Sequence, residues 1–486
     1  GSTGSVPIEF AGWLPAFRTF GNCGQHPQFR HINYPLEGYH FTYSQPPALD
    51  EMDSSAVSQS TKLKEADLIG LEKVLRAVLI PWRSLVALAT VAPGVGWVDR
   101  CRTLWAAARL YSRFRAAGCS RLAALQFLYT RHLTSQYWLT SQVKNPAFFT
   151  SIPYTFNQLP WFIEIEDVTT LFFPFVHNGQ TCQLNFRELP VYPAVKALLE
   201  SDECRGILTH IRSTAEMLPR LFQSEQIARK VFYAPLGVEL LPAVQRPLRG
   251  RDEPIELLFT NSWSQGAINF KLRGGLDVLE AFRLLKLRYP RLRLTLRSTL
   301  PELHRHYQRI VASDDVQLID RKVSNQEMQE LHQRADIYLL PAARIHIVSL
   351  LGAMAHGLPV VVSDGWGFEE YVDDGRNGLV VRGRYGVSSW ADQEAGVLRE
   401  DYHTLHSPEP PIVAGLVEAV SRLIEDPGYR VRLGQNARQD VEQYYNLDRW
   451  NAALKEAFDR GLGKMVQSEQ EPLPASGVPE LATSNV

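Results

Sequence analysis

Short apolar segments alternate with helix-like segments along the second half of the chain, and this alternation restricts the fold more than any other feature. The apolar runs have the length and the Val, Ile and Leu content of buried strands, and the segments between them have helical periodicity. The predicted strands are IELLFTN (255–261), LRLTLRS (292–298), VQLID (316–320), DIYLLP (336–341), LPVVVSD (358–364) and GLVV (378–381). Strands that alternate with helices form a parallel sheet, so the sequence predicts a doubly wound α/β domain.

A second α/β pattern precedes this one. WFIEIED (161–167) is a β-rich run, and RGILTHI (205–211) predicts another strand that is followed by a helix over 213–222. KVFYAPLGVEL (230–240) indicates a strand and the loop that leaves it. The three prolines of LPAVQRPLRGRDEP (241–254) then indicate a linker.

Chain length and these patterns together predict two domains. The chain has 486 residues, which is too many for one ordinary core. The predicted parts are an N-terminal Rossmann-like domain (1–240), a linker (241–254), a C-terminal Rossmann-like domain (255–440), helices that cross back (441–464) and a disordered tail (465–486). Because ligands bind at the carboxyl ends of strands in such sheets, we expect a binding cleft between the two domains.

Charge and cysteine content exclude several classes of protein. Lys and Arg number 51 against 52 Asp and Glu, so no overall field favours nucleic acid. Arginines gather at 100–131 and 283–297, which indicates either solvated element faces or a patch for a membrane surface. Five scattered cysteines without a CxxC pair argue against a disulfide framework and a zinc site. We therefore expect a cytoplasmic protein, with peripheral membrane association left open.

Two segments of the second domain carry groups that suit an anion. After the first predicted strand, a loop leads to Lys271 and Arg273, and a Gly-Gly pair opens the next helix. The helix that follows the fourth predicted strand places the first-turn amides of 347–350 at the same edge. An arginine fork and helix N-terminal N–H groups together bind phosphate oxygens. The alternative is ordinary packing of two helix starts.

A third segment, SDGWGFEEYVDDGRNGLVV (363–381), combines glycines with acids. Gly365 and Gly367 allow the backbone to pass close to a ligand. Glu369 and Glu370 stand at the start of the next predicted helix. An acid suits a helix N-terminus, and we interpret Glu369 as the residue that fills that role.

The order of these motifs resembles that of GT-B glycosyltransferases of family four. The segments that carry the resemblance are RGGLDVLEAF, VSNQEMQELHQRADIYLLPA and GAMAHGLPVVVSDGWGFEEYVDDGRNGLVV, with ILTHIRSTAEMLPRLF and KVFYAPLGVEL upstream. The resemblance covers residues 205–461. It implies the GT-B fold and transfer of a sugar, with retention, from a nucleotide diphosphate, without a metal or other cofactor. A UDP-sugar is the favoured donor and a GDP-sugar the second choice; the implied acceptor is a glycan, a lipid-linked glycan or a protein.

The resemblance also implies roles for individual residues. Arg273, helped by Lys271, would bind the diphosphate and act in catalysis. The other donor-binding positions are Val323 beside the base, the helix N-terminus at Val348, Ser349 and Leu350, and the Gly-rich loop with Gly367 and Glu370.

The helix of 347–356 departs from the family pattern at two positions. Arg344 and Gly352 stand where the family has the two glutamates that contact sugar and ribose. Arg344 and His346 would serve a donor with its own negative charge, contact the diphosphate, or be surface residues of a divergent site. These three interpretations stay open.

In the first domain, the strand over 161–167 ends in acids. Alternation places Glu164 and Glu166 on one face of the strand. Glu166 and Asp167 stand where the family often has a histidine that contacts the donor sugar. We therefore predict that they contact the sugar or position the leaving group and acceptor. The alternative is a carboxylate satisfied by a neighbouring arginine.

Two other functions fit the same fold. The changes at Arg344 and Gly352 are also expected of a catalytically inactive GT-B binding or scaffold protein. A phosphorylase or epimerase would use the same cleft with different chemistry.

Overall fold

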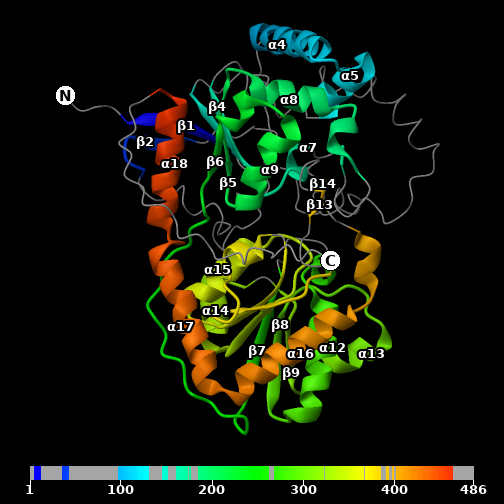
Figure 1. Cartoon of the computed structure of the whole chain (residues 1–486), viewed down its shortest axis with the longest axis vertical. Coiled ribbons are helices and arrows are strands. Elements are labelled where there is room, and N and C mark those ends of the chain that lie inside the picture. The colour runs from blue at the N-terminus through cyan, green and yellow to red at the C-terminus, as the bar shows by residue number, and fades with distance from the viewer. Residues whose placement is uncertain are drawn as a thin grey trace, which may run out of the picture.

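The computed structural model consists of two α/β domains, each built on a six-stranded parallel sheet (Figure 1). It describes residues 5–11, 36–42, 97–130, 145–150, 160–172, 175–176, 184–261, 268–321, 323–365, 367–384, 390–392, 397–398 and 401–463. The predicted fold class, two Rossmann-like sheets flanked by helices, is confirmed. The tail predicted over 465–486 lies outside the described residues.

The N-terminal sheet has the strand order β2-β1-β3-β4-β5-β6, and every neighbouring pair is parallel. The strands are β1 (Val6–Ala11), β2 (Tyr39–Thr42), β3 (Ala147–Thr150), β4 (Trp161–Glu164), β5 (Cys204–Thr209) and β6 (Val231–Tyr233). All four residues of β4 are buried, as expected for a central strand that is covered on both faces. The predicted strands over 161–167 and 205–211 are therefore present as central, neighbouring strands.

Helices pack around this sheet, and α4 and α5 lie at the end of the domain that is remote from the C-terminal domain (Figure 1). The helices are α4 (Trp97–Ala116), α5 (Arg121–Thr130), α7 (Thr169–Phe172), η4 (Phe186–Glu188), α8 (Tyr192–Glu200), α9 (Arg212–Phe222) and α10 (Glu225–Ala228). Stacked rings of Phe172, Tyr192 and Phe222 join α7, α8 and α9. This aromatic packing holds α9 at the sheet edge that faces the other domain.

The C-terminal sheet has the order β12-β11-β10-β7-β8-β9, again with parallel pairs. Its strands are β7 (Ile255–Thr260), β8 (Leu292–Arg297), β9 (Val316–Ile319), β10 (Ile337–Leu340), β11 (Val360–Ser363) and β12 (Leu379–Val381). The chain starts at β7, proceeds outward to β9 and returns to β10 beside β7. Loops after β7 and β10 therefore leave in opposite directions, which creates the switch point where ligands of such sheets bind.

Helices lie between the strands as predicted. They are α11 (Ile268–Leu272), α12 (Gly275–Arg288), α13 (Arg305–Val311), α14 (Asn325–Arg334), α15 (Ile347–Ala355), η5 (Phe368–Glu370), η6 (Tyr402–His406) and α16 (Pro410–Glu425). Lys271, which was expected in a loop, lies in the short helix α11. A short antiparallel hairpin, β13 (Trp390–Asp392) and β14 (Val397–Leu398), lies between β12 and η6 in the chain. None of the helices in the described ranges is both long and apolar enough to cross a bilayer.

Two final helices connect the domains. α17 (Pro427–Gln443) packs on the C-terminal domain and α18 (Leu447–Gly461) lies against the N-terminal sheet (Figure 1). Phe458 of α18 contacts the rings of Tyr39, Phe148 and Phe162 edge to face. Because each such contact buries aromatic surface, α18 belongs to the N-terminal core although it comes last in the sequence.

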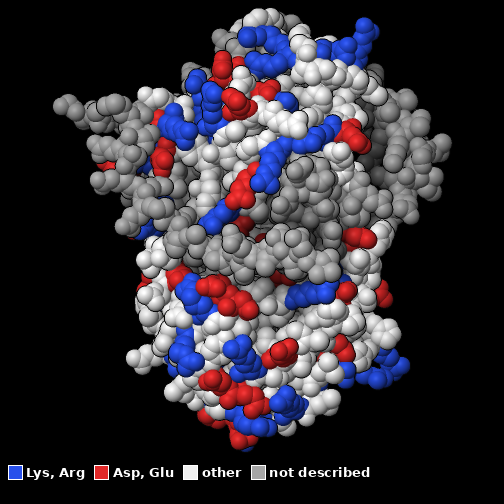
Figure 2. All heavy atoms as spheres, viewed as in Figure 1, with Lys and Arg blue, Asp and Glu red and all other residues white. Residues whose placement is uncertain are grey.

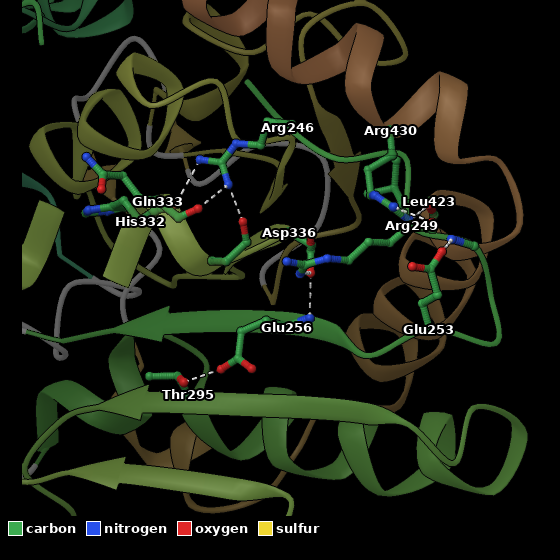
Figure 3. Close-up of polar contacts among 12 residues, drawn as sticks. Arg246, Arg249, Glu253, Glu256, Thr295, His332, Gln333, Asp336, Leu423 and Arg430 are labelled. Carbon is green, nitrogen blue, oxygen red and sulfur yellow. Dashed lines mark hydrogen bonds and ion pairs between the residues drawn. The ribbon is translucent and has the colours of Figure 1, made fainter. Parts of the chain in front are cut away.

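Hydrogen bonds and an ion pair attach the predicted linker, 241–254, to the C-terminal domain (Figure 3). Arg246 donates to the backbone carbonyls of His332, Gln333 and His356, and burial lowers its pKa to about 10. Arg249 forms an ion pair of 2.7 Å with the buried Asp336. The part of the linker around Arg246 and Arg249 is therefore fixed to the C-terminal domain.

Candidate functional site

The carboxyl ends of β7 and β10 bring two helix starts together. Gly274 adopts a left-handed conformation with φ 80° just before α12. A Cβ built on Gly274 would lie 2.3 Å from the carbonyl oxygen of Pro341, the residue that follows β10. Only glycine permits this approach, and it sets Arg273 directly beside the entry to α15.

Arg273 is a buried cation at this junction. Its side chain is held by hydrogen bonds from Nη1 to the carbonyl of Thr260, at 3.0 Å, and to Oγ of Ser349, at 2.9 Å. Burial lowers its pKa to about 10. Its Nε makes no hydrogen bond, and no carboxylate of the described residues lies within ion-pair distance. Because a buried charge is costly without a counter-charge, this group suits an anionic ligand.

The N-terminus of α15 faces the same junction. His346 precedes the helix and provides no side-chain cap. The N–H groups of Val348 and Ser349 have no helical acceptor by geometry, whereas Leu350 N–H donates to the carbonyl of His346 at 3.3 Å. Burial, followed by the charges of Arg273 and Arg344, lowers the pKa of His346 well below its ordinary value, so it is neutral. The helix end is therefore an uncapped positive dipole beside Arg273.

Lys271 does not join this group. It lies in the last turn of α11, and its Nζ is 3.2 Å from Nδ1 of His406 in η6. Val323 is buried just before α14, whose start is closed by a capping box between Ser324 and Glu327. At Gly352, an added Cβ would meet no atom within 4 Å. The helix thus has open space where the family pattern has a glutamate.

The N-terminal domain presents acids at the ends of β4 and β5. Glu164 and Glu166 both approach the ring of His210, with Oε1 atoms 3.5 Å from Nδ1 and 3.8 Å from Nε2. Both glutamates therefore approach one histidine, although β4 ends at Glu164 and Glu166 lies beyond the strand. Glu164 and His210 are almost fully buried, whereas the side chain of Glu166 is 31% exposed.

Burial and charge act on the pKa values of this cluster. Burial raises the pKa of Glu166, and the nearby His210 and Arg344 oppose that rise. Burial alone would lower the pKa of His210, but its bonds and attraction to Glu164 and Glu166 outweigh burial and raise it. Glu166 and His210 therefore both retain their protons more readily than the free side chains would.

His210 is a site residue that the sequence motifs did not identify. It follows β5 directly, and β5 pairs with β4 in register so that Glu164 lies opposite Leu208. The sequence does show two predicted strands, 161–167 and 205–211, that each end near titratable residues. To infer that these residues meet, one must know that the two strands are neighbours in the sheet, and sequence alone does not specify strand order in a sheet.

A charged pair joins the domains at the position where the family pattern is altered. Nη2 of Arg344 is 3.8 Å from Oδ2 of the buried Asp167, and its Nη1 donates to the hydroxyl of Tyr402 at 3.4 Å. The other oxygen of Asp167 accepts from Thr169 N–H at 2.7 Å. Arg344 is only 20% exposed, so it faces the other domain and is not a simple surface residue.

Glu370 is also used across the interface. Its two carboxylate oxygens accept the N–H groups of Arg212 and Ser213, the first two residues of α9. Tyr371 donates to the carbonyl of His210, and Gly367, with φ 81°, passes so close to Ile211 that a Cβ would lie 2.6 Å from it. Glu370, rather than Glu369, therefore meets a helix N-terminus, and that helix belongs to the other domain. Burial raises the pKa of Glu369 to about 7.

One family model matches part of the C-terminal domain. Residues 265–400 match the family model described as glycosyl transferases group 1. This segment is therefore similar to glycosyl transferases group 1. The matched segment contains Arg273, the whole of α15 and the 367–371 segment, so most of the anion-suited groups lie inside the glycosyltransferase match.

Several solved structures are similar to this chain. The N-terminal domain of trehalose-6-phosphate phosphatase from Candida albicans matches with a TM-score of 0.50 and 11% identity, over 94% of this chain and 97% of that chain. Sucrose-phosphate synthase from Thermosynechococcus elongatus matches with a TM-score of 0.48 and 16% identity, over 71% and 79%. Anabaena Alr3699/HepE, solved in complex with UDP and glucose, matches with a TM-score of 0.43 and 13% identity, over 70% of this chain and 81% of that chain. No curated protein matched the sequence.

Proposed function

We propose that this chain is a retaining glycosyltransferase that moves a sugar from a nucleotide diphosphate, with a UDP-sugar favoured over a GDP-sugar, to a glycan, lipid-linked or protein acceptor. One observation carries the proposal. Arg273 is buried, has no carboxylate partner among the described residues, and lies beside the uncapped N-terminus of α15 within the glycosyltransferase match. A diphosphate supplies the missing negative charge, and Val323 would lie beside the base.

Arg273 and α15 would act on the leaving group. Negative charge grows on the diphosphate as the bond to the anomeric carbon breaks, and fixed donors that already point at it lower the barrier. Arg273 is held in place by Thr260 and Ser349, so it need not reorganise during the reaction. The acceptor hydroxyl would pass its proton to a phosphate oxygen, which leaves no step that requires a metal or other cofactor.

The acids of the N-terminal domain would act on hydroxyl groups. Glu166 is the most exposed acid of the β4–β5 cluster and accepts hydrogen bonds from sugar or acceptor hydroxyls in this proposal. Asp167 and Arg344 would form the boundary of the sugar site. His210 lies between the two glutamates, with Nδ1 3.5 Å from Glu164 and Nε2 3.8 Å from Glu166, and its proton would attract both.

A nucleotide-binding protein without transferase activity is the second candidate. Arg344 is paired with Asp167, Gly352 offers no side chain, and Glu370 is bonded to α9. Of three positions that would contact the donor in the family pattern, two therefore carry a different residue and the third already bonds another part of the chain. This arrangement favours a site that keeps phosphate recognition and has lost or altered sugar recognition.

Calorimetric titration of the full chain with UDP and GDP tests the proposal. We expect UDP to bind and Arg273→Ala to weaken it at least about 30-fold, because a buried charge-assisted contact contributes about 2 kcal/mol. Arg430→Ala is the matched control, since Arg430 is equally buried and donates to the carbonyls of Leu423 and Arg249. Unchanged UDP affinity in Arg273→Ala would show that the phosphate site is wrong.

Measurements of turnover distinguish the transferase from the binding protein and from a phosphorylase. Release of UDP from a panel of UDP-sugars in the presence of glycan acceptors supports the transferase. Nucleotide binding without release under any acceptor supports the binding protein. Product that forms only with free phosphate would instead identify a phosphorylase.

A further inference from the structure

The exposed apolar side chains of this protein are concentrated on α4 and α5. Nine large hydrophobic residues of the described ranges are exposed, and five of them lie in these two helices. The most prominent are Trp97, Leu122, Trp105 and Leu125, which are 78%, 73%, 64% and 56% exposed. The remaining four are leucines elsewhere: Leu240 and Leu248 in the connection before β7, Leu287 in α12 and Leu318 in β9. Scattered exposed leucines are ordinary, whereas a local concentration that includes two tryptophans marks a contact surface.

Helix geometry shows that these residues are on the outer face. On α4, Ala106, Leu110 and Phe114 recur every four residues and are buried against the domain. Trp97 and Trp105 are eight residues apart and form a second stripe that is exposed. Packing within the chain therefore accounts for one face of α4 and leaves the tryptophan face unexplained.

The second helix repeats this arrangement. Ala124, Phe127 and Leu128 are buried, and the ring of Phe127 meets that of Phe114 edge to face at 5.2 Å. Leu122 and Leu125 stand one turn apart on the exposed side of α5. Both helices thus use one apolar face for the core and expose a second.

The same segment is strongly basic. Residues 97–130 contain six arginines and one aspartate, in a chain whose formal net charge is -1. The guanidinium of Arg109 lies over the ring of Trp105, 4.7 Å from its centroid, and Arg121 is exposed beside Leu122. Arg113 is paired with Glu203 and is left out of the surface. Figure 2 shows basic side chains at the end of the molecule where α4 and α5 lie.

We propose that the outer face of α4 and α5, formed by Trp97, Trp105, Arg109, Arg121, Leu122 and Leu125, binds the surface of an anionic lipid membrane. Tryptophan prefers the boundary between water and lipid, and leucine enters the acyl region. Arginine reaches lipid phosphates while its stem stays on apolar surface. The face lies at the end of the N-terminal domain remote from the C-terminal domain, so a flat surface can reach it (Figure 1). The proposal is independent of glycosyl transfer.

Co-sedimentation of the full chain with lipid vesicles tests the apolar part of the face. We expect binding to vesicles of phosphatidylcholine with phosphatidylglycerol, weaker binding to phosphatidylcholine alone, and partial release by salt. Trp97→Ser, Trp105→Ser, Leu122→Ser and Leu125→Ser combined should reduce partitioning at least about tenfold. The matched control is Leu248→Ser with Leu287→Ser, which removes two other exposed leucines and leaves binding unchanged.

Charge and insertion are tested separately. Arg109→Glu with Arg121→Glu should remove the preference for phosphatidylglycerol, while Arg293→Glu, at another exposed site, should not. A polarity-sensitive fluorophore on Cys101, which is exposed between the two tryptophans, should shift to shorter wavelength when vesicles are added. Cys23→Ser and Cys182→Ser restrict labelling to Cys101, because Cys119 and Cys204 are buried.

Several outcomes overturn the proposal. One is absence of vesicle binding by the wild-type chain, and another is equal binding by the fourfold serine variant with native melting behaviour. A third is a dimer in light scattering that becomes monomeric in that variant, which would assign the face to a second copy. If the serine variant does not fold, the arginine pair and the Cys101 fluorophore decide alone, and an unshifted fluorophore then refutes the proposal.

Discussion

The two sides of the interdomain site differ in charge and in construction. The C-terminal side offers Arg273, the N-terminus of α15 and Arg344, which suit phosphate and other anions. The N-terminal side offers the carboxylates around His210, which suit hydroxyl groups. In the proposed reaction, each domain therefore recognises a different chemical part of the donor, and the site is complete only where the domains meet.

The two sides also differ in how the chain builds them. The C-terminal groups come from helix starts that a single backbone approach, Gly274 against Pro341, fixes in place. The N-terminal groups come from the ends of two neighbouring strands, β4 and β5. The first arrangement depends on local glycine conformation, and the second depends on strand pairing. The following variants separate these dependences, from the largest expected effect to the smallest.

Gly274→Ala should have the largest effect. The added Cβ would meet the carbonyl of Pro341 at 2.3 Å in a backbone conformation that suits glycine, so we expect a loss of about 3 kcal/mol in unfolding free energy. Gly118→Ala is the control: its φ is +99° but no atom lies within 4 Å, so about 1 kcal/mol is expected. Urea denaturation measures both, and equal losses would mean that the contact with Pro341 is unimportant.

Arg344→Met comes next. It leaves the buried Asp167 without its ion-pair partner, and we expect a loss of about 1.5 kcal/mol, moderated because Arg344 is partly exposed and the pair is 3.8 Å long. Adding Asp167→Asn should recover part of that loss, since the amide keeps the acceptor for Thr169 N–H and needs no counter-charge. A strictly additive double variant would contradict coupling between the two domains at this pair.

Glu370→Gln tests the bond between Glu370 and α9. The amide has one acceptor oxygen for the two N–H groups of Arg212 and Ser213, and it lacks the charge that favours a helix N-terminus. We expect a loss of about 1 kcal/mol in unfolding free energy by urea denaturation. Glu369→Gln, at the adjacent residue, should cost less because no bond from Glu369 to α9 is present. The reverse order would assign the contact to Glu369.

The smallest effect concerns pH. The pKa of His210 is raised in the fold by Glu164, Glu166 and Glu370, so its stabilisation is complete below its ordinary value of 6.5 and is lost as pH rises through the raised value. Burial raises the pKa of Glu166, which acts in the same direction. Unfolding free energy should thus fall with rising pH near neutrality, and His210→Gln should reduce that slope to the part that comes from carboxyl groups such as Glu369, whose pKa is raised to about 7. His306→Gln, which removes an exposed histidine paired with Glu280, should leave the slope unchanged.

Much of the C-terminal domain was predictable because its signals are local. The six strand segments, the helix after Arg273 and the helix at 347–355 each follow from apolar periodicity and glycine placement within a few residues. The two-domain arrangement follows from their alternation. The same local signals placed Glu369 and Glu370 at a helix start, and both lie in the first turn of η5. They could not show that Glu370 also accepts from the first residues of α9 in the other domain.

The interdomain contacts were not predictable, because they join residues far apart in the chain. His210 meets Glu164 through the pairing of β4 with β5, and Arg344 meets Asp167 only because the domains face each other. Likewise, the prolines of 241–254 predicted a linker, but no local signal showed that Arg246 and Arg249 attach it to the C-terminal domain. Each partner lies tens of residues or more away, beyond the range of any periodic signal.

The sequence by itself determined the succession of strands and helices along the chain, the anion-suited helix starts, and the absence of a carboxylate at Arg344 and Gly352. Those features depend on residues that are close together in the sequence and on the local backbone conformation. The tertiary structure alone decided what Arg344 contacts, which acid caps α9, and that His210 holds the acids of β4. Strand pairing and domain contact bring together charges that the chain keeps apart, and buried charges then select their partners because an unpaired one is costly.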